Sequence, residues 1–182
     1  MEIEPLAVPG CFLIRPDLAS DSRGCFVKTV HSTTMEAKGL NCNFREQYFS
    51  RSHHDVVRGL HFQVPPHDHD KLVYCVAGKA LDVVVDLRKG SPRFGKACAV
   101  VLNGGESTGV WLPRGCAHGF LSLEDDTMLF YHVTSEYAPE SDCGILWNSI
   151  PFDWPVRNPT VSGRDCSFPP LPTFESPFVF KG

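Results

Sequence analysis

The sequence lacks any apolar run long enough to cross a membrane. The longest runs, such as the one around Val83 to Val85, have the length of a β-strand. There is no cluster of lysine and arginine, and the net charge of −4 gives no electrostatic footprint for nucleic acid. The first ten residues, MEIEPLAVPG, are acidic and include no apolar segment of the kind a signal peptide needs. We therefore expect a cytoplasmic protein that binds neither nucleic acid nor a membrane.

No C-x-x-C pair occurs among the eight cysteines, which are widely spaced. Disulfide frameworks belong to small secreted chains, and this chain of 182 residues is neither small nor marked for export. We expect mostly buried, reduced thiols that pack as small hydrophobic groups. The length fits one domain, residues 1–182, with a substantial core.

Alternation of apolar and polar residues dominates the chain, with Gly, Pro, Asp and Ser turn signals between many of the segments. Many short strands at close spacing are typical of an all-β sandwich or jelly roll. The predicted strands are Phe12–Arg15, Gly24–Val30, Phe44–Arg51, Val56–Gln63, Lys71–Val76, Ala80–Leu87, Ala97–Leu102, Gly109–Leu112, Gly119–Leu123 and Met128–Thr134.

One short helix is predicted at Thr33–Lys38, because Thr33 and Glu36 have the spacing of a capping box and Gly39 is placed to end the helix. Residues 151–182 are rich in Pro, Phe and Ser and show little periodicity. We expect this tail to wrap the surface.

A jelly roll leaves a pocket between its two curved sheets, lined by alternate residues of the inner faces. His61 shares one face of its strand with Gln63, and Lys71 shares one face of the next strand with Val73. If neither strand has a bulge, His61 and Lys71 both line the pocket.

A metal site is one alternative. Metal-binding jelly rolls of the cupin type use an H-x-H pair, a nearby Glu and a third His after a P-x-G turn; this chain has His67, His69 and, in PRGCAH, His118. The Glu is missing, since residues 72–74 are Leu, Val and Tyr, and the H-D-H follows two prolines in an expected loop. Three imidazoles can hold zinc, so a metal-dependent oxygenase or isomerase using these histidines stays open.

The chain resembles the dTDP-4-dehydrorhamnose 3,5-epimerase family from about Ile14 to Pro169. The resemblance is carried by DSRGCF, SRSHHDVVRGLHFQ, PP followed by KLV, VDLRKGSPRFG, WLPRGCAHGF, EYAPESDCGILWN, and FDWP followed by SGRD. It implies a cupin-type jelly roll that needs neither metal nor cofactor. It also implies a substrate that is a nucleotide-linked 4-keto-6-deoxyhexose, with dTDP as the nucleotide, in deoxysugar biosynthesis.

The same resemblance implies roles for four residues. The C4 ketone acidifies the hydrogens on C3 and C5, so inversion needs a base, stabilisation of the enolate and an acid on the opposite face. His61 matches the family base, whose ordinary pKa near 6.5 suits this task, and Asp165 matches the carboxylate that orients it. Lys71 matches the cation beside O4, and Tyr131 matches the phenol that reprotonates carbon.

Substrate binding follows from the resemblance in the same way. Arg23 and Arg58 match arginines near the diphosphate, and Phe26 and Tyr137 match aromatic contacts to the nucleoside. His118 matches a pocket histidine, although a structural histidine after a tight turn is an equal alternative. In the family, some contacts come from the neighbouring subunit, notably around DSRGCF. A homodimer is therefore expected, with residues of about 1–30 at its interface.

Four positions depart from the family pattern. Glu46 and Tyr48 stand where the family usually has Gln and Asn, and His69 and Asp70 stand where Gln and Gly are common. An ionised Glu only accepts hydrogen bonds and would repel a diphosphate, so we expect Glu46 to affect substrate choice. Inversion at C3 alone, at C5 alone or at both uses the same proton machinery. A non-catalytic jelly roll that binds a sugar nucleotide is the third alternative.

Overall fold

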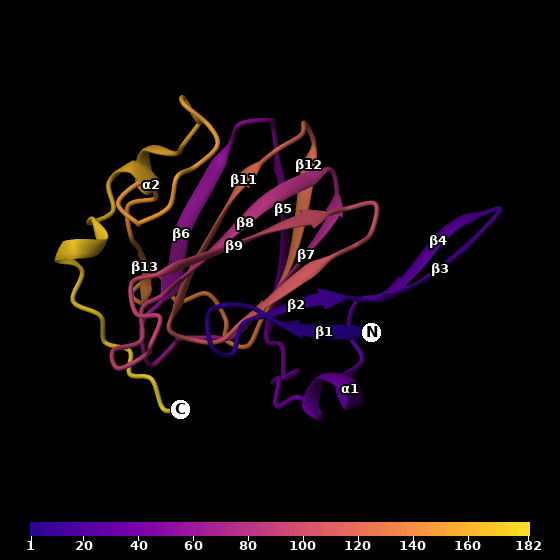
Figure 1. Cartoon of the computed structure of the whole chain (residues 1–182), viewed down its shortest axis with the longest axis horizontal. Helices are drawn as coiled ribbons and strands as arrows, with labels where there is room; N and C mark the ends of the chain where they lie inside the picture. Colours follow the sequence, from indigo (N-terminus) through magenta and orange to yellow (C-terminus); the bar gives the residue numbers. More distant parts are fainter.

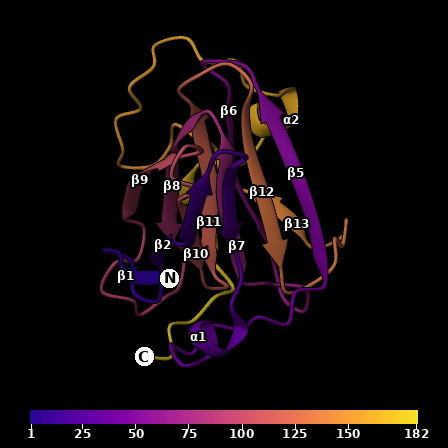
Figure 2. The ribbon, with the colours of Figure 1, turned by 90° about the vertical axis from the view of Figure 1, so that its right-hand side faces the viewer.

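Two antiparallel sheets face each other in a computed structural model that describes all 182 residues (Figures 1 and 2). The first sheet has the order β1-β2-β10-β7-β12-β5. Its strands are β1 (Glu2–Pro5), β2 (Phe12–Arg15), β10 (Gly109–Leu112), β7 (Lys71–Ala77), β12 (Thr127–Val133) and β5 (Glu46–Ser52). The second sheet has the order β13-β6-β11-β8-β9. Its strands are β13 (Asp142–Gly144), β6 (Val57–Gln63), β11 (Cys116–Ser122), β8 (Lys79–Asp86) and β9 (Ala97–Asn103).

The main core fills the space between the sheets. Val73, Leu129 and Val110 from the first sheet pack with Val84 and Phe120 from the second, all of them buried. Burial of such side chains contributes about 1.5–3 kcal/mol each. This packing confirms the predicted all-β fold of the cupin-type jelly roll.

The outer face of the second sheet is covered by the C-terminal part of the chain. Leu60 and Val85 point outward and pack with Ile145, Ile150 and Phe178. This explains why β8 reads as a nearly continuous apolar segment, since both of its faces are buried. The same C-terminal part carries a short helix, α2 (Gly163–Cys166), and a 3₁₀ turn, η1 (Leu171–Thr173).

The helix α1 (Ser32–Glu36) closes a third apolar cluster, in which Met35 and Leu40 pack against Tyr74 of the first sheet. The predicted capping box is wrong: the N-cap is His31, whose side chain does not cap the helix, and Thr33 already lies inside it. Gly39 ends the turn as predicted, with a φ of 74° and its N–H donating to the Glu36 carbonyl.

A separate hairpin of β3 (Asp17–Asp21) and β4 (Gly24–Lys28) extends away from both sheets (Figure 1). It pairs with no other strand, and nearly all of its residues are exposed. An isolated two-stranded ribbon is marginal in water, so this hairpin has no stabilising partner within the chain.

All ten predicted strands are present with small shifts of their ends, and β1, β3 and β13 are additional short strands. All eight cysteines are free thiols, but the expectation that most are buried is wrong. Cys25 and Cys166 are exposed, Cys42, Cys98 and Cys143 are half-buried, and only Cys11, Cys75 and Cys116 are buried. No helix is long and apolar enough to span a membrane.

Candidate active site

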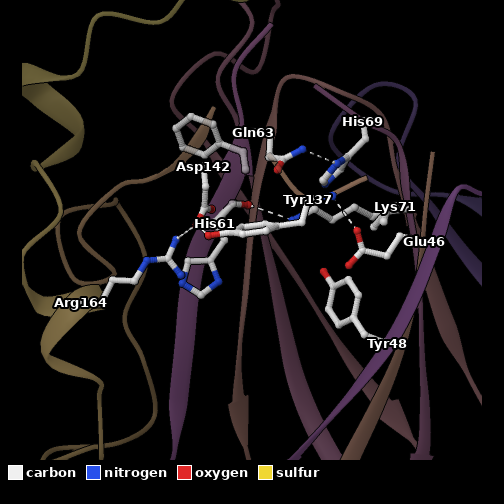
Figure 3. A pocket seen from close by; sticks show the side chains of 11 residues that line it. Glu46, Tyr48, His61, Gln63, His69, Lys71, Tyr137, Asp142 and Arg164 are labelled. Carbon is white, nitrogen blue, oxygen red and sulfur yellow. Dashed lines mark hydrogen bonds and ion pairs between the residues drawn. The ribbon is translucent and has the colours of Figure 1, made fainter. Parts of the chain in front are cut away.

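A cavity opens between the sheets at the edge where β5, β6, β7 and β12 meet (Figure 3). It has two adjoining parts of about 310 and 200 Å³, which share Tyr48, His61 and Lys71. The larger part also holds Glu46, Gln63, His69, Tyr137, Asp142 and Arg164. The smaller part also holds Ser50, Arg58, His118 and Tyr131. The prediction that His61 and Lys71 line one pocket is confirmed, although each strand does have a bulge, β6 between Arg58 and His61 and β7 between Cys75 and Ala77.

His61 and Asp165 form a hydrogen-bonded pair, with 2.8 Å between Nε2 and Oδ1. Burial acts to raise the pKa of Asp165, but hydrogen bonds from His61 and from the Gly59 N–H outweigh it and hold the pKa below its usual value. An ionised carboxylate only accepts, so Nε2 of His61 carries the proton. Nδ1 is then left with a free lone pair, in the state a general base requires.

Local backbone geometry brings this pair together. Gly59 has a φ of 132°, and a Cβ there would lie 2.6 Å from the Cα of Gly119, so no other residue fits. The Gly59 N–H donates to Asp165 at 3.0 Å. On the other side Ser162 caps α2 by accepting from the Asp165 N–H. The carboxylate is therefore fixed from both sides before any ligand binds.

Lys71 lies at the floor of the cavity with only 7% of its surface exposed. Its Nζ donates to the His61 carbonyl at 3.2 Å, so it is held next to the candidate base. Burial lowers the pKa of Lys71 to about 8, although Asp142 and Asp82 oppose the shift. The ammonium form still predominates at neutral pH, where it can stabilise a negative oxygen.

Tyr131 is buried on β12 and lines the smaller part of the cavity. Its hydroxyl is 3.4 Å from the Ser50 Oγ, which is its single hydrogen bond within the chain. Burial raises the pKa of Tyr131 well above its ordinary value. The phenol therefore stays neutral and keeps a proton to donate.

His118 forms a second buried pair with Asp82, with 2.7 Å between Nε2 and Oδ2. The other Asp82 oxygen is buried without a partner, and the His118 ring meets Tyr131 edge-on at 6.1 Å. Arg58 is anchored by Ser52 and by the Arg51 carbonyl at the same part of the cavity. His118 therefore combines the two alternatives: it makes a structural hydrogen bond with Asp82 and it lines the pocket.

Tyr137 lies across the mouth of the larger part (Figure 3). Its N–H donates to Glu46 at 2.6 Å, and its hydroxyl donates to Asp142, which also pairs with Arg164 of α2. Tyr137 is 60% exposed despite these anchors. Three of the four departures from the family pattern, Glu46, Tyr48 and His69, line this part of the cavity.

Arg23 and Phe26 are not brought to this cavity. They lie on the projecting β3–β4 hairpin, where Arg23 pairs with Asp21 and Phe26 is exposed. Sequence reasoning assigned no role to Ser50, Gln63, Asp82, Asp142 and Arg164, which line the cavity or contact its residues. Asp142 and Arg164 lie within ESDCG and SGRD, which belong to the segments that resemble the family. This position was the one feature of the sequence that could have assigned them to the site.

The alternative in which His67, His69 and His118 hold a metal is wrong. No group of three His, Cys, Asp or Glu side chains lies close enough to hold a metal ion. His67 and His69 instead bond Ser141 and Ser135 through their Nδ1 atoms. Burial, with Lys71 and Arg114 nearby, lowers the pKa of His69 to about 3, so its ring is neutral.

Comparisons with known proteins agree with this geometry. The profile of the dTDP-4-dehydrorhamnose 3,5-epimerase family matches residues 5–173. The Shigella flexneri dTDP-4-dehydrorhamnose 3,5-epimerase is 38% identical over 168 residues, covering 91% of this chain and 93% of the relative.

Two solved structures show the same fold. The Legionella pneumophila dTDP-6-deoxy-D-glucose-3,5-epimerase, in complex with dTDP-4-keto-L-rhamnose, has a TM-score of 0.90 and 33% identity, covering 96% of this chain and 94% of its own. A 3′-monoepimerase from Streptomyces bikiniensis, in complex with dTDP-quinovose, has a TM-score of 0.86 and 34% identity, covering 93% and 88%. The chain is an isomerase-class sugar epimerase and belongs to the dTDP-4-dehydrorhamnose 3,5-epimerase family.

Proposed function

We propose that this protein inverts C3, C5 or both in a dTDP-linked 4-keto-6-deoxyhexose by way of an enolate. The observation that carries the proposal is the arrangement of three groups around one cavity. His61, oriented by Asp165, lies beside Lys71, and Tyr131 lines the same space. Base, cation and neutral acid are the groups that proton transfer next to a ketone requires.

His61 takes the first proton in this scheme. Its Nδ1 removes the hydrogen next to the C4 ketone, and the electrons of that C–H bond pass into the enolate. Asp165 stabilises the imidazolium that forms, and the Lys71 ammonium stabilises the negative charge on O4. Tyr131 then gives its hydroxyl proton to the same carbon from the opposite face, which inverts the centre, and is reprotonated by solvent.

The relatives support the choice of substrate class. The Legionella enzyme is in complex with dTDP-4-keto-L-rhamnose and the Streptomyces monoepimerase with dTDP-quinovose. Both 3,5-epimerases and a 3′-monoepimerase are therefore structural relatives, so inversion of one carbon or of both is compatible with this machinery. We assign Arg58 to the diphosphate and Tyr137 to the nucleotide base, and the lining of the cavity by both residues supports this.

We further propose that residues 1–182 work as one domain in a cytoplasmic homodimer. The projecting β3–β4 hairpin supports this, because it pairs with no other strand, its Phe26 is exposed and its Arg23 pairs only with Asp21 of the same hairpin. A second copy would receive them at its cavity, as a family member is expected to do. Eight free thiols favour a reducing compartment.

The test is deuterium incorporation in heavy water with dTDP-4-keto-6-deoxyglucose. We expect label at C3, C5 or both in the wild type, and a rate at least about 10²-fold lower in His61→Asn. His53→Asn is the matched control, because His53 is exposed and outside the cavity. Absence of label at both carbons with bound substrate would instead favour a non-catalytic binding protein.

A further inference from the structure

Tyr48 is the aromatic neighbour of Tyr131 on the adjacent strand. The two residues are directly paired in the register of β5 and β12. Their rings stack with 4.7 Å between centroids and 15° between planes. The Tyr131 ring also makes a T-shaped contact with the His118 ring, with 6.1 Å between centroids. Two aromatic neighbours therefore fix the plane of the candidate acid.

Hydrogen bonding holds Tyr131 less firmly than this packing does. Its single bond, to Ser50, is long at 3.4 Å, beyond the usual range for two hydroxyl groups. Ser50 and Tyr48 belong to the same strand, β5, which is the edge of its sheet and pairs only with β12. On the β7 side Tyr131 is paired with the aliphatic Val73, so the aromatic and hydrogen-bonded support from its own sheet comes from β5.

Tyr48 also belongs to the cavity itself. It lines both of the adjoining parts, and its hydroxyl end points into the larger one (Figure 3). Tyr48 is 41% exposed, but desolvation of its hydroxyl end, with Glu46 and Asp142 nearby, raises the pKa of Tyr48 to about 12, so the ring stays uncharged. Nothing therefore repels the stacked pair at neutral pH.

We propose that Tyr48 is a positioning residue that holds Tyr131 in line for proton delivery. It thereby decides whether the enolate is converted into the epimer or back into the substrate. This rests on the proposed function. Once His61 has taken the proton, the enolate can be reprotonated in two ways. His61 can give a proton back on the same face, which regenerates the substrate, or Tyr131 can give one on the opposite face. A misaligned Tyr131 favours the return.

The measured quantity is the ratio of deuterium in recovered substrate to epimer formed, in heavy water. His61 is partly exposed, so its bound proton exchanges with solvent before it is returned. An aromatic pair of this kind corresponds to roughly a three- to tenfold bias in orientation. We expect Tyr48→Ala to raise the ratio by about that factor, and Tyr48→Phe, which keeps the stacked ring, to restore it to the wild-type value.

The matched control is Phe49→Ala. Phe49 is the next residue on β5, is 61% exposed and is absent from the cavity lining. A merely structural loss would lower exchange and inversion together and leave the ratio unchanged. An unchanged ratio in folded Tyr48→Ala would overturn the proposal.

A second measurement needs no turnover and separates this proposal from the proposed function. Ring-labelled tyrosine NMR reports the rate at which the Tyr131 ring flips. We expect slow flipping in wild type, Tyr48→Phe and Phe49→Ala, and fast flipping in Tyr48→Ala. Equal flip rates in all four proteins contradict the positioning role, even if the wild type proves inactive on the substrate tested.

Discussion

The Nε2 atom of His61 lies 2.8 Å from the Oδ1 atom of Asp165, although 104 residues separate the two in the sequence. His61 comes from β6 and Asp165 from the short helix α2. The bridge between Val56 and Thr160 and the bond from the Gly59 N–H to Asp165 bind the two segments together. The tautomer of the candidate base thus depends on how the tail packs against β6.

Asp165→Asn should therefore impair catalysis without unfolding the chain. The amide of Asn can present an N–H to His61, which would place the imidazole proton on Nδ1 and remove the free lone pair from the cavity. We expect kcat to fall by about 10³- to 10⁴-fold, while the thermal midpoint changes little. Glu136→Gln, a neutralised surface carboxylate, is the control. A near-normal kcat in Asp165→Asn would show that orientation of His61 does not depend on this bond.

Tyr131→Phe should separate proton abstraction from inversion. His61 is untouched, so substrate hydrogens should still exchange with deuterium. The acid on the opposite face is lost, so formation of the epimer should fall by about 10²- to 10⁴-fold. NMR of substrate and product measures both rates in one sample. Parallel loss of exchange and inversion would instead place Tyr131 in substrate binding.

Because of Lys71, we expect folding stability and activity to change in opposite directions as the pH rises above 8. Its pKa of about 8 in the fold lies below the ordinary 10.5 of the unfolded chain. Between these values the unfolded state binds more protons, so folding stability rises with pH. Activity falls over the same range, because the ammonium that stabilises the enolate is lost.

Lys71→Met tests this directly. Removing the buried charge should flatten the rise of stability between pH 8 and 10.5 and increase stability at pH 7 by up to about 3 kcal/mol, at 1.36 kcal/mol per pKa unit. The same variant should lose most of its activity at every pH. Urea titrations at several pH values measure the first effect. A variant with the wild-type slope would mean that Lys71 is not the group responsible.

Glu46→Gln should strengthen binding of dTDP. The carboxylate at the cavity mouth repels the diphosphate, whereas the amide keeps an oxygen that can accept from the Tyr137 N–H. We expect Kd for dTDP to fall by roughly two- to fivefold at low salt and the difference to shrink as salt is added. Glu136→Gln makes the same charge change outside the cavity. Equal affinity gains in both variants would point to net charge alone.

Acid should destabilise the fold through His69. Its pKa is lowered from 6.5 to about 3 by burial, Lys71 and Arg114. Below pH 6.5 the unfolded chain gains a proton that the folded ring resists, so stability is lost as pH falls toward 3. His69→Gln should show a shallower loss than the wild type in thermal melts between pH 6.5 and 4. Identical slopes of stability against pH in the two proteins would mean that other groups cause the loss of stability in acid.

The strands were predictable because period-two alternation survives wherever one face is buried and the other is not. His61 and Lys71 follow from that periodicity, since β6 and β7 keep their alternation on the segments that carry them. Each of these strands has one bulge outside those segments, β6 between Arg58 and His61 and β7 between Cys75 and Ala77. The roles of Asp165 and Tyr131, in contrast, came from the resemblance alone.

The remaining features depend on tertiary placement that no local pattern encodes. The stacking of Tyr48 on Tyr131 needs the register between β5 and β12, and the role of Arg164 needs the docking of α2. The capping box at Thr33 failed because the N-cap of α1 lies two residues earlier, at His31. The spacing of the H-D-H histidines suggested a metal site, but spacing does not determine where the Nδ1 atoms point. In the structure both Nδ1 atoms are hydrogen-bonded to serine hydroxyls.

The position of Asp165 after every strand in the sequence also bears on which fragments of the protein can be active. A fragment that ends before Asp165 still includes every strand, since the last of them is β13. It would hold a histidine without its carboxylate, and an outer face of β6 that lacks Phe174 and Phe178 from its cover. A fragment that ends before Asp165, whether from stalled synthesis or from a cut in the exposed tail, should therefore be inert.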